Sequence, residues 1–186
     1  MLESSPAVDA VLLRQALGLF ASGVTVICAA EPASGEVRGM TANAFMSGSL
    51  TPPLIMVSVR HQAHMHAMIT ESGAYGVSIL PEGLEREARR FAGMPVAAHE
   101  PGPRFQHLDG VPFLEGALCS FTARVASTHE IGDHTLFIGE VFGVDLAGRD
   151  QPALGYYRSR FTKVEQLDGS PVLPIDQWSG AFDAWG

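Results

Sequence analysis

Residues 117–145 read ALCSFTARVASTHEIGDHTLFIGEVFGVD, and this stretch decides the fold. Two apolar runs, 117–129 and 134–145, flank the pair Gly132–Asp133. A Gly-Asp pair between two such runs is typical of a tight hairpin turn. The stretch therefore predicts two long antiparallel strands joined by a short turn.

The segments around this hairpin supply further strands and a few helices. Strands are predicted at residues 24–29, 54–59, 75–80 and about 160–166, and a strand followed by a loop at 37–49. Helices are predicted over 9–21, with Asp9 as N-cap, over 62–72 and over about 82–92, and a long Pro/Gly/His-rich excursion over 93–113. Six or so strands without regular strand–helix alternation favour a mainly β fold, an antiparallel barrel with attached helices.

Length and composition indicate one globular domain. The chain has 186 residues, 46% of them hydrophobic, and a net charge of −8, which argues against general nucleic-acid binding. Its two cysteines, Cys28 and Cys119, favour a reducing cytoplasm, and we expect no signal peptide and no membrane span. Residues 1–166 are predicted to form the domain and 167–186 a C-terminal tail, in which Trp178, Phe182 and Trp185 recur at helical spacing.

Several classes of site are excluded by motif. The sequence contains no GxGxxG, GxxxxGK[ST], HExxH or GxSxG. The run HQAHMH, with His61, His64 and His66, raises the alternative of a metal site. A helical or extended segment would scatter these rings, whereas zinc needs three or four ligands at one point. A solvated or anion-facing segment is therefore the preferred interpretation, and no metal is expected.

Three segments in fixed order resemble the flavin reductase-like family of NAD(P)H:flavin oxidoreductases. They are FASGVTVI (20–27), GMTANAFMSGSLTPPLIMVSV (39–59) and GDHTLFIGEV (132–141), and ALGYYRSRF (153–161) is a weaker fourth. The resemblance implies a six-stranded antiparallel Greek-key split β-barrel, a homodimer, and a flavin at the subunit interface. It covers about residues 12–165.

In the first predicted flavin segment, small residues alternate with polar ones. Small side chains let backbone N–H groups approach a flat ring, and hydroxyl and amide groups can bond its polar edge. Asn43 is the only asparagine in the chain. The alternative is a strand end that runs into an ordinary turn. With the resemblance, flavin contacts are predicted for Thr41, Ala42, Asn43, Ala44 and Ser47.

A second flavin segment begins where a buried strand turns polar. Proteins of the resembling family hold the flavin phosphate here, at Ser58, Val59, Arg60 and His61, with hydroxyls at two positions that are Ala63 and Met65 in this chain. Arg60, His61 and His64 are expected to supply charge in their place, because helix-start N–H groups and a guanidinium suit phosphate. Arg89 and Arg90 are further candidates for binding the phosphate. The alternative is that they lie on a solvated helix face.

The family places the histidine of Gly132–Asp133–His134 near the flavin ring and the nicotinamide. Asp133 and His134 are therefore predicted to border the dinucleotide, with His134 as the catalytic residue that orients it. Tyr156 is predicted to border the flavin, or else to be a core tyrosine.

The resemblance implies an NADH-dependent flavin oxidoreductase that reduces FAD or FMN and supplies diffusible reduced flavin to a partner monooxygenase. FAD is slightly preferred over FMN, because Arg60, His61, His64 and His66 offer more positive charge than one monophosphate requires; NADPH is an alternative donor. The rival interpretation is a split-barrel protein that binds flavin or haem without catalysis. The Gly-Asp-His segment favours the enzyme, since a storage protein needs no nicotinamide pocket.

Overall fold

The structure is a computed structural model that describes residues 8–97, 101–146, 148 and 150–165. Most of these residues lie in antiparallel strands, with three α-helices beside them. The predicted mainly β fold with attached helices is confirmed. The predicted tail at 167–186 and its stripe of Trp178, Phe182 and Trp185 lie outside the described residues.

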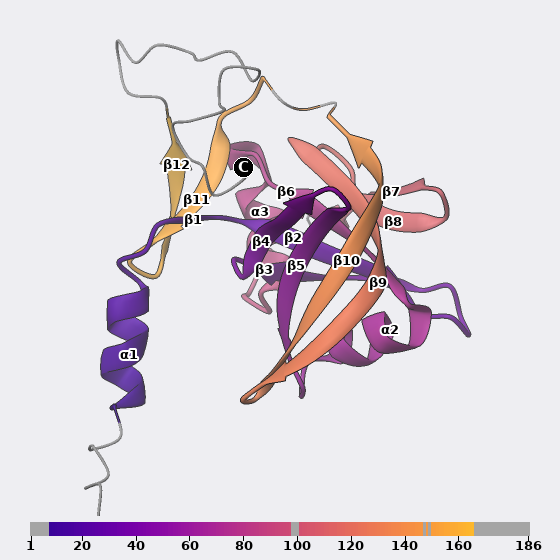
Figure 1. Ribbon diagram of the computed structural model, residues 1–186. Helices are drawn as coiled ribbons and strands as arrows, with labels where there is room; N and C mark the ends of the chain where they lie inside the picture. Colours follow the sequence, from indigo (N-terminus) through magenta and orange to yellow (C-terminus); the bar gives the residue numbers. More distant parts are fainter. Residues whose placement is uncertain (1–7, 98–100, 147, 149, 166–186) are drawn as a thin grey trace, which may run out of the picture.

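The largest element is an antiparallel sheet of seven strands (Figure 1). Its strands run in the order β3 (Val37–Ala42), β2 (Thr25–Ala30), β6 (Ala74–Ile79), β9 (Cys119–Ile131), β10 (His134–Asp145), β5 (Pro53–Arg60) and β4 (Phe45–Leu50). β9 and β10 form the predicted hairpin, which pairs from His134 opposite Ile131 to Asp145 opposite Ser120. Gly132 in its turn has φ +64°, a conformation that glycine adopts without strain.

The barrel prediction is corrected in two respects. The sheet has seven strands rather than six, because the chain bends at Asn43 and divides the predicted strand and loop at 37–49 into β3 and β4. These two strands are the edges of the sheet, and no ladder joins them within the described part of the chain. The sheet is therefore open along the seam between β3 and β4.

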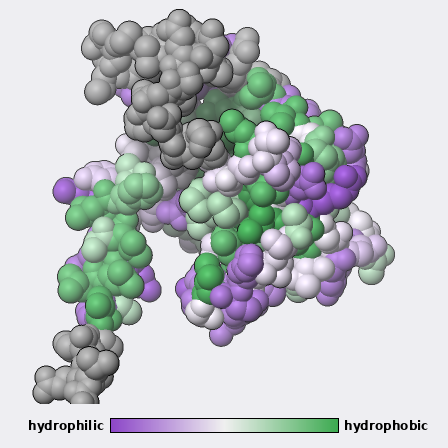
Figure 2. Space-filling model, in the orientation of Figure 1, coloured by the Kyte–Doolittle hydropathy of each residue, from purple (hydrophilic) through white to green (hydrophobic). Residues whose placement is uncertain are grey.

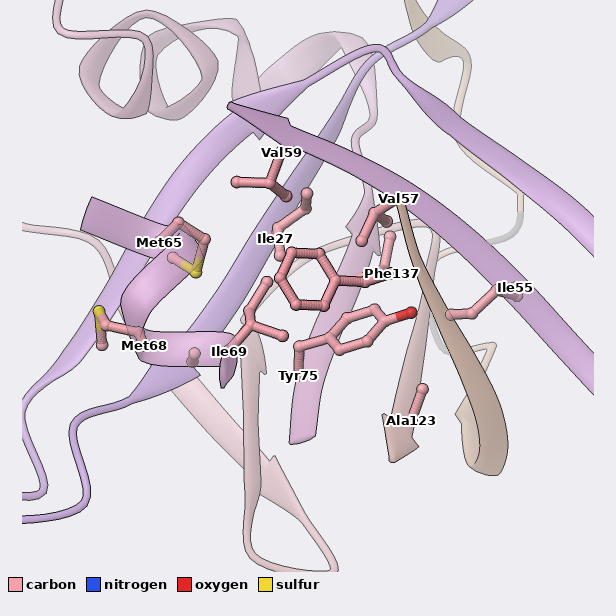
Figure 3. Close-up of a cluster of buried hydrophobic side chains, with 12 residues drawn as sticks. Ile27, Ile55, Val57, Val59, Met65, Met68, Ile69, Tyr75, Ala123 and Phe137 are labelled. Carbon is pink, nitrogen blue, oxygen red and sulfur yellow. The ribbon is translucent and has the colours of Figure 1, made fainter. Parts of the chain in front are cut away.

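The core of the sheet lies on the face that β5 and β10 fill with alternate side chains. Ile55, Val57 and Val59 of β5 are buried, whereas the side chains between them are half-buried on the opposite face. The helix α2 (His64–Ser72) packs on this inner core through Met65, Met68 and Ile69 (Figure 3). Alternation along each strand thus separates an inner core from an outer face.

A second cluster covers the outer face of one half of the sheet. Val26 and Cys28 of β2 pack there with Leu80, Ala88 and further buried residues, Val24, Leu114 and Leu154. Ala88 belongs to the helix α3 (Glu85–Phe91), Leu114 to β8 (Val111–Leu114) and Leu154 to β11 (Ala153–Tyr157). Burial raises the pKa of the Cys28 thiol to about 12 and, with the charge of Asp145, that of Cys119 to about 11.

Two smaller sheets, one of two strands and one of three, lie outside the main sheet. β7 (Phe105–Leu108) and β8 form a hairpin inside residues 93–113, which were predicted as an excursion without strands. β11 pairs with β1 (Ser22–Gly23) and with β12 (Arg160–Val164). Tyr156 therefore lies in a strand that the sequence did not predict, just before the last strand, β12. The predicted helix at 82–92 is present as a short 3-10 turn, Glu82–Leu84, followed by α3.

The N-terminal helix α1 (Ala10–Leu17) projects from the body of the molecule (Figure 1). Asp9 caps it as predicted, since its carboxylate accepts hydrogen bonds from the backbone N–H groups of Val11 and Leu12 at 3.2 and 3.3 Å. No residue of α1 is buried, and its apolar side chains are visible in Figure 2. No helix within the described residues is long and apolar enough to cross a membrane.

Candidate functional site

The pairing of β5 with β10 brings two predicted site segments together. Arg60 lies opposite His134, Val59 opposite Thr135, and Ser58 opposite Leu136. Arg60 and His134 lie on the outer face, where a ligand can reach them. Val59 is fully buried in the inner core, so only its backbone is left for the predicted contact.

Asp133 links the two cationic groups at this position. Its Oδ1 lies 2.6 Å from Nδ1 of His134, and its Oδ2 lies 3.7 Å from Nε of Arg60. The hydrogen bond with His134, aided by the charge of Arg60, lowers the pKa of the Asp133 carboxyl. With Nδ1 held by this carboxylate, Nε2 is the ring nitrogen of His134 that remains for a ligand.

The same turn also holds the segment that follows β5. The backbone N–H of His61 donates to the carbonyl of Asp133 at 3.1 Å. Nε2 of His61 lies 2.7 Å from Oε2 of Glu130. Sequence reasoning missed Glu130. The signal was present, because a two-residue turn at Gly132–Asp133 places Glu130 opposite Thr135 of β10, the strand that pairs with β5.

A cavity of about 180 Å³ brings together four other predicted residues, Thr41, Ala42, Asn43 and Tyr156. Val24, Ala92, Met94 and Phe161 complete its lining. The Thr41 hydroxyl donates to the carbonyl of Ala88 in α3 at 2.7 Å, so its oxygen remains an acceptor toward a ligand. Asn43 is exposed at the bend, which leaves its amide available to a ligand.

A second cavity, of about 240 Å³, lies at the start of α2. It is lined by Arg38, Gly39, Met40, Ala63, His64, Met65 and Met68. The N-cap residue Ala63 makes no side-chain hydrogen bond to the first turn of this nine-residue helix. Uncapped N–H groups at a helix start suit an anion. Both cavities border β3, one at residues 38–40 and the other at 41–43.

Three further predicted residues neither line a cavity nor take part in the contacts at the hairpin turn. The backbone of Ala44 accepts a hydrogen bond from the N–H of Ser58 at 3.1 Å. Ser47 is exposed on β4, beside an irregularity in the pairing with β5. Arg90 lies on α3, and its guanidinium donates to the carbonyl of Pro101 at 3.0 Å rather than into a cavity.

The described histidines do not form a metal site. No group of three or more His, Cys, Asp or Glu side chains is arranged to hold a metal ion within the described residues. His61 and His66 are in edge-to-face contact, with ring centroids 5.5 Å apart, and His64 lines the second cavity. Cationic side chains, an uncapped helix start and two cavities thus lie along β3, β5 and α2.

Comparison with known proteins gives a consistent result. Residues 17–165 match the family described as "Flavin reductase like domain". The chain is 46% identical over 167 residues to an NADH-dependent flavin reductase of Rhodococcus sp, which covers 89% of this chain and 92% of that protein. It is 40% identical over 156 residues to the NADH-dependent flavin reductase StyB of Pseudomonas fluorescens, which covers 83% and 89%.

Solved structures agree with the sequence relatives. The fold is similar to that of flavin reductase PheA2 in its native state, with a TM-score of 0.77 and 38% identity over 85% of this chain and 99% of that chain. It is also similar to the NADH:FAD oxidoreductase SgcE6 of Streptomyces globisporus in complex with NAD and FAD fragments. That match has a TM-score of 0.76 and 33% identity, and covers 89% and 100% of the two chains.

Proposed function

The chain belongs to the flavin reductase-like domain family, and we propose that it is an NADH-dependent flavin reductase that supplies reduced flavin to a separate monooxygenase. The observation that carries this function is the 46% identity to an NADH-dependent flavin reductase across nearly the whole of both chains. Another relative, 37% identical over 153 residues, is the reductase component of a 4-hydroxyphenylacetate 3-monooxygenase from Thermus thermophilus. The rival interpretation as a non-catalytic flavin- or haem-binding protein has no such support.

The flavin is a substrate in this scheme, with FAD preferred over FMN. We assign its phosphate to the start of α2, near His64, Arg60 and His61. The uncapped N–H groups of the first turn and the adjacent cavity fit a phosphate. Ala63 and Met65 provide no hydroxyl there, which suits a flavin that must leave after each turnover.

The isoalloxazine ring is assigned to the neighbouring cavity. Thr41, Ala42, Asn43 and Tyr156 line its wall, and the Thr41 oxygen and the Asn43 amide can bond the polar edge of a ring. Ala44, Ser47 and Arg90 remain proposed flavin contacts, although none of them lines either cavity.

His134 is assigned to the nicotinamide. Asp133 holds its Nδ1, so the ring is oriented with Nε2 toward a ligand on the outer face. NADH, when bound, passes a hydride to the flavin, and this reaction needs no proton relay at the carbon that gives up the hydride. The protein contributes mainly proximity: it binds both substrates and orients them in contact.

The chain is also proposed to act as a homodimer. α1 leaves large apolar side chains in water, among them Leu12 at 60% and Leu17 at 64% exposure. The outer face of β4, β5 and β10 carries a second apolar row, in which Met46 pairs with Met56 and Met56 with Ile138. A helix without a buried face and an uncovered apolar row support mutual burial between two copies. Analytical ultracentrifugation should give a dimer, and Leu12→Asp with Leu17→Asp should shift it toward monomer.

An anaerobic assay tests the activity. A trace of protein is mixed with FAD, in large excess over the protein, and with more NADH than FAD, and the visible absorbance of the flavin is followed. We expect the protein to bleach all the FAD. FAD that stays oxidised would overturn the assignment and leave the non-catalytic binding protein.

A further inference from the structure

The carboxylate of Glu130 joins side chains from three other parts of the fold. Its Oε2 lies 2.7 Å from Nε2 of His61, in the segment after β5. Its Oε1 accepts a hydrogen bond from the Thr135 hydroxyl of β10 at 2.9 Å. The same hydroxyl oxygen lies 2.8 Å from Nε2 of His66 in α2. A continuous hydrogen-bond chain thus runs from α2 through β10 and β9 to the segment after β5.

The chemistry of these groups fixes the direction of each hydrogen bond. An ionised carboxylate only accepts, and a hydroxyl carries one hydrogen. Thr135 gives that hydrogen to Glu130, so its oxygen must accept from His66, and Nε2 of His66 must carry a hydrogen. Nε2 of His61 must likewise carry the hydrogen that it donates to Glu130. The carboxylate therefore determines the tautomer of two rings.

The hydrogen-bond chain from His66 to His61 is protected from water at its centre. Thr135 is 2% exposed, and the ring of His66 makes edge-to-face contacts with His61 and with Phe137, at centroid distances of 5.5 and 5.3 Å. His61 is thus held from two sides, by the carboxylate of Glu130 and by the ring of His66. Hydrogen bonds with a buried member gain strength from their surroundings.

The side chains that Glu130 holds bracket the segment to which the flavin phosphate is assigned. Outside the helix and the strand ladder, the backbone hydrogen bonds between Arg60 and His66 run from His61 to Asp133, from Ala63 to Arg60 and from His66 to Ala63. Nδ1 of His61 has no hydrogen-bond partner within the described part of the chain, and a protonated ring would donate from it to a phosphate. Asp133 plays the corresponding part for His134, at the nicotinamide side.

We propose that Glu130 is a positioning residue for flavin binding, which holds His61 and, through Thr135 and His66, the first turn of α2 in the arrangement that receives the phosphate. This proposal rests on the proposed function for the place of the flavin. Glu130 does not touch the flavin and acts through His61. Glu130 is thus a second carboxylate of this hairpin, besides Asp133, that holds a histidine of the proposed site.

Flavin titration and steady-state kinetics of three variants test the proposal. Glu130→Ala should weaken FAD binding about five- to thirtyfold, as expected for the loss of a charge-assisted hydrogen bond that orders a ligand contact. The turnover number at saturating FAD and the KM for NADH should change less than about twofold. Glu130→Gln keeps an acceptor oxygen and should lose less of its affinity for FAD than Glu130→Ala does. Glu71→Gln is the matched control, an exposed glutamate of α2 that should behave as wild type.

A double-mutant cycle separates positioning from a general structural effect. Because Glu130 acts through His61, Glu130→Ala should add little to the loss caused by His61→Ala. Additive losses, an unchanged affinity in Glu130→Ala, or a tighter affinity from relief of charge repulsion would each overturn the proposal. Melting curves check the fold, and if Glu130→Ala unfolds, the cycle is run with Glu130→Gln. Failure of the proposed function is distinguishable, since wild type would then not oxidise NADH with added flavin.

Discussion

Nδ1 of His134 lies 2.6 Å from Oδ1 of Asp133, its neighbour in the turn between β9 and β10. The contact fixes the ring in one orientation, and the pairing of β10 with β5 sets Arg60 opposite it. A single carboxylate thereby arranges a ring that can hydrogen-bond and a guanidinium that can bind an anion at one end of the sheet. The proposed division between a nicotinamide side and a phosphate side begins at this turn.

Replacement of His134 by Ala should impair the use of NADH more than the binding of flavin. The ring is assigned to the nicotinamide, and the loss of one hydrogen bond to a bound group costs about 1–3 kcal/mol, so the KM for NADH should rise roughly five- to hundredfold. Initial rates at varied NADH, with a separate flavin titration, measure both effects. His129→Ala is the control, an exposed histidine on β9. A matching loss of flavin affinity would place His134 on the flavin instead.

The Asp133 carboxyl should make folding stability depend on pH in the acid range. Its hydrogen bond with His134, with help from Arg60, lowers its pKa from the ordinary 3.8. A lowered pKa in the folded state means that the carboxylate stabilises the fold above the ordinary pKa, and that this contribution is lost as the pH falls through the lowered value.

Melting temperatures of wild type and Asp133→Asn, measured from neutral pH to about pH 3, test this dependence. The wild type should melt higher at neutral pH, and the difference should shrink in acid. The effect should be small, because the side chain is exposed and solvent screens it. A difference that stays constant across the range would show that Asp133 does not stabilise the fold through its charge.

Asn43→Leu should weaken flavin binding and leave the fold intact. Asn43 is exposed at the bend between β3 and β4 and lines the cavity assigned to the ring. Leucine would leave a polar atom of the ring unpaired, at a cost of about 1–3 kcal/mol, or roughly five- to hundredfold in affinity. Gln106→Leu, the same kind of change at an exposed position of β7, is the control. Unchanged flavin affinity in Asn43→Leu would move the ring away from this cavity.

How much of this arrangement could be predicted from the sequence depends on the range of the interactions. The hairpin at Gly132–Asp133 and the N-cap at Asp9 are local, and both were predicted because turn and cap chemistry lie within a few residues. The hairpin of β7 and β8 was missed although Asp109–Gly110 is a strong turn signal, because the surrounding Pro, Gly and His residues resemble a loop.

The candidate site was predictable as segments, but the contacts between them were not. The contact of His61 with Glu130 and that of His66 with Thr135 join residues 69 positions apart, through the register of β5, β9 and β10. Register depends on the packing of whole strands, which no single motif encodes. The direction of Arg90, toward Pro101, is a tertiary feature of the same kind.

Arg60→Ala should weaken flavin binding, by a larger factor at low salt than at high salt. The guanidinium is exposed, three residues before Ala63 of the cavity assigned to the phosphate, and its attraction for a charged group is screened by ions. Calorimetry with FAD and with FMN, at two salt concentrations, measures the affinity of wild type and variant. Wild type should bind in the micromolar range and prefer FAD. A loss independent of salt would show that Arg60 acts through packing rather than charge.

Flavin is proposed to enter and leave as a substrate, and NADH consumption by dialysed protein shows whether it does. We predict that the dialysed protein is colourless and leaves NADH unchanged when alone. On addition of FAD in air, it should oxidise many equivalents of NADH at a rate that saturates with FAD. A yellow protein that keeps one flavin per chain through dialysis, or NADH that is stable after FAD is added, would contradict the account.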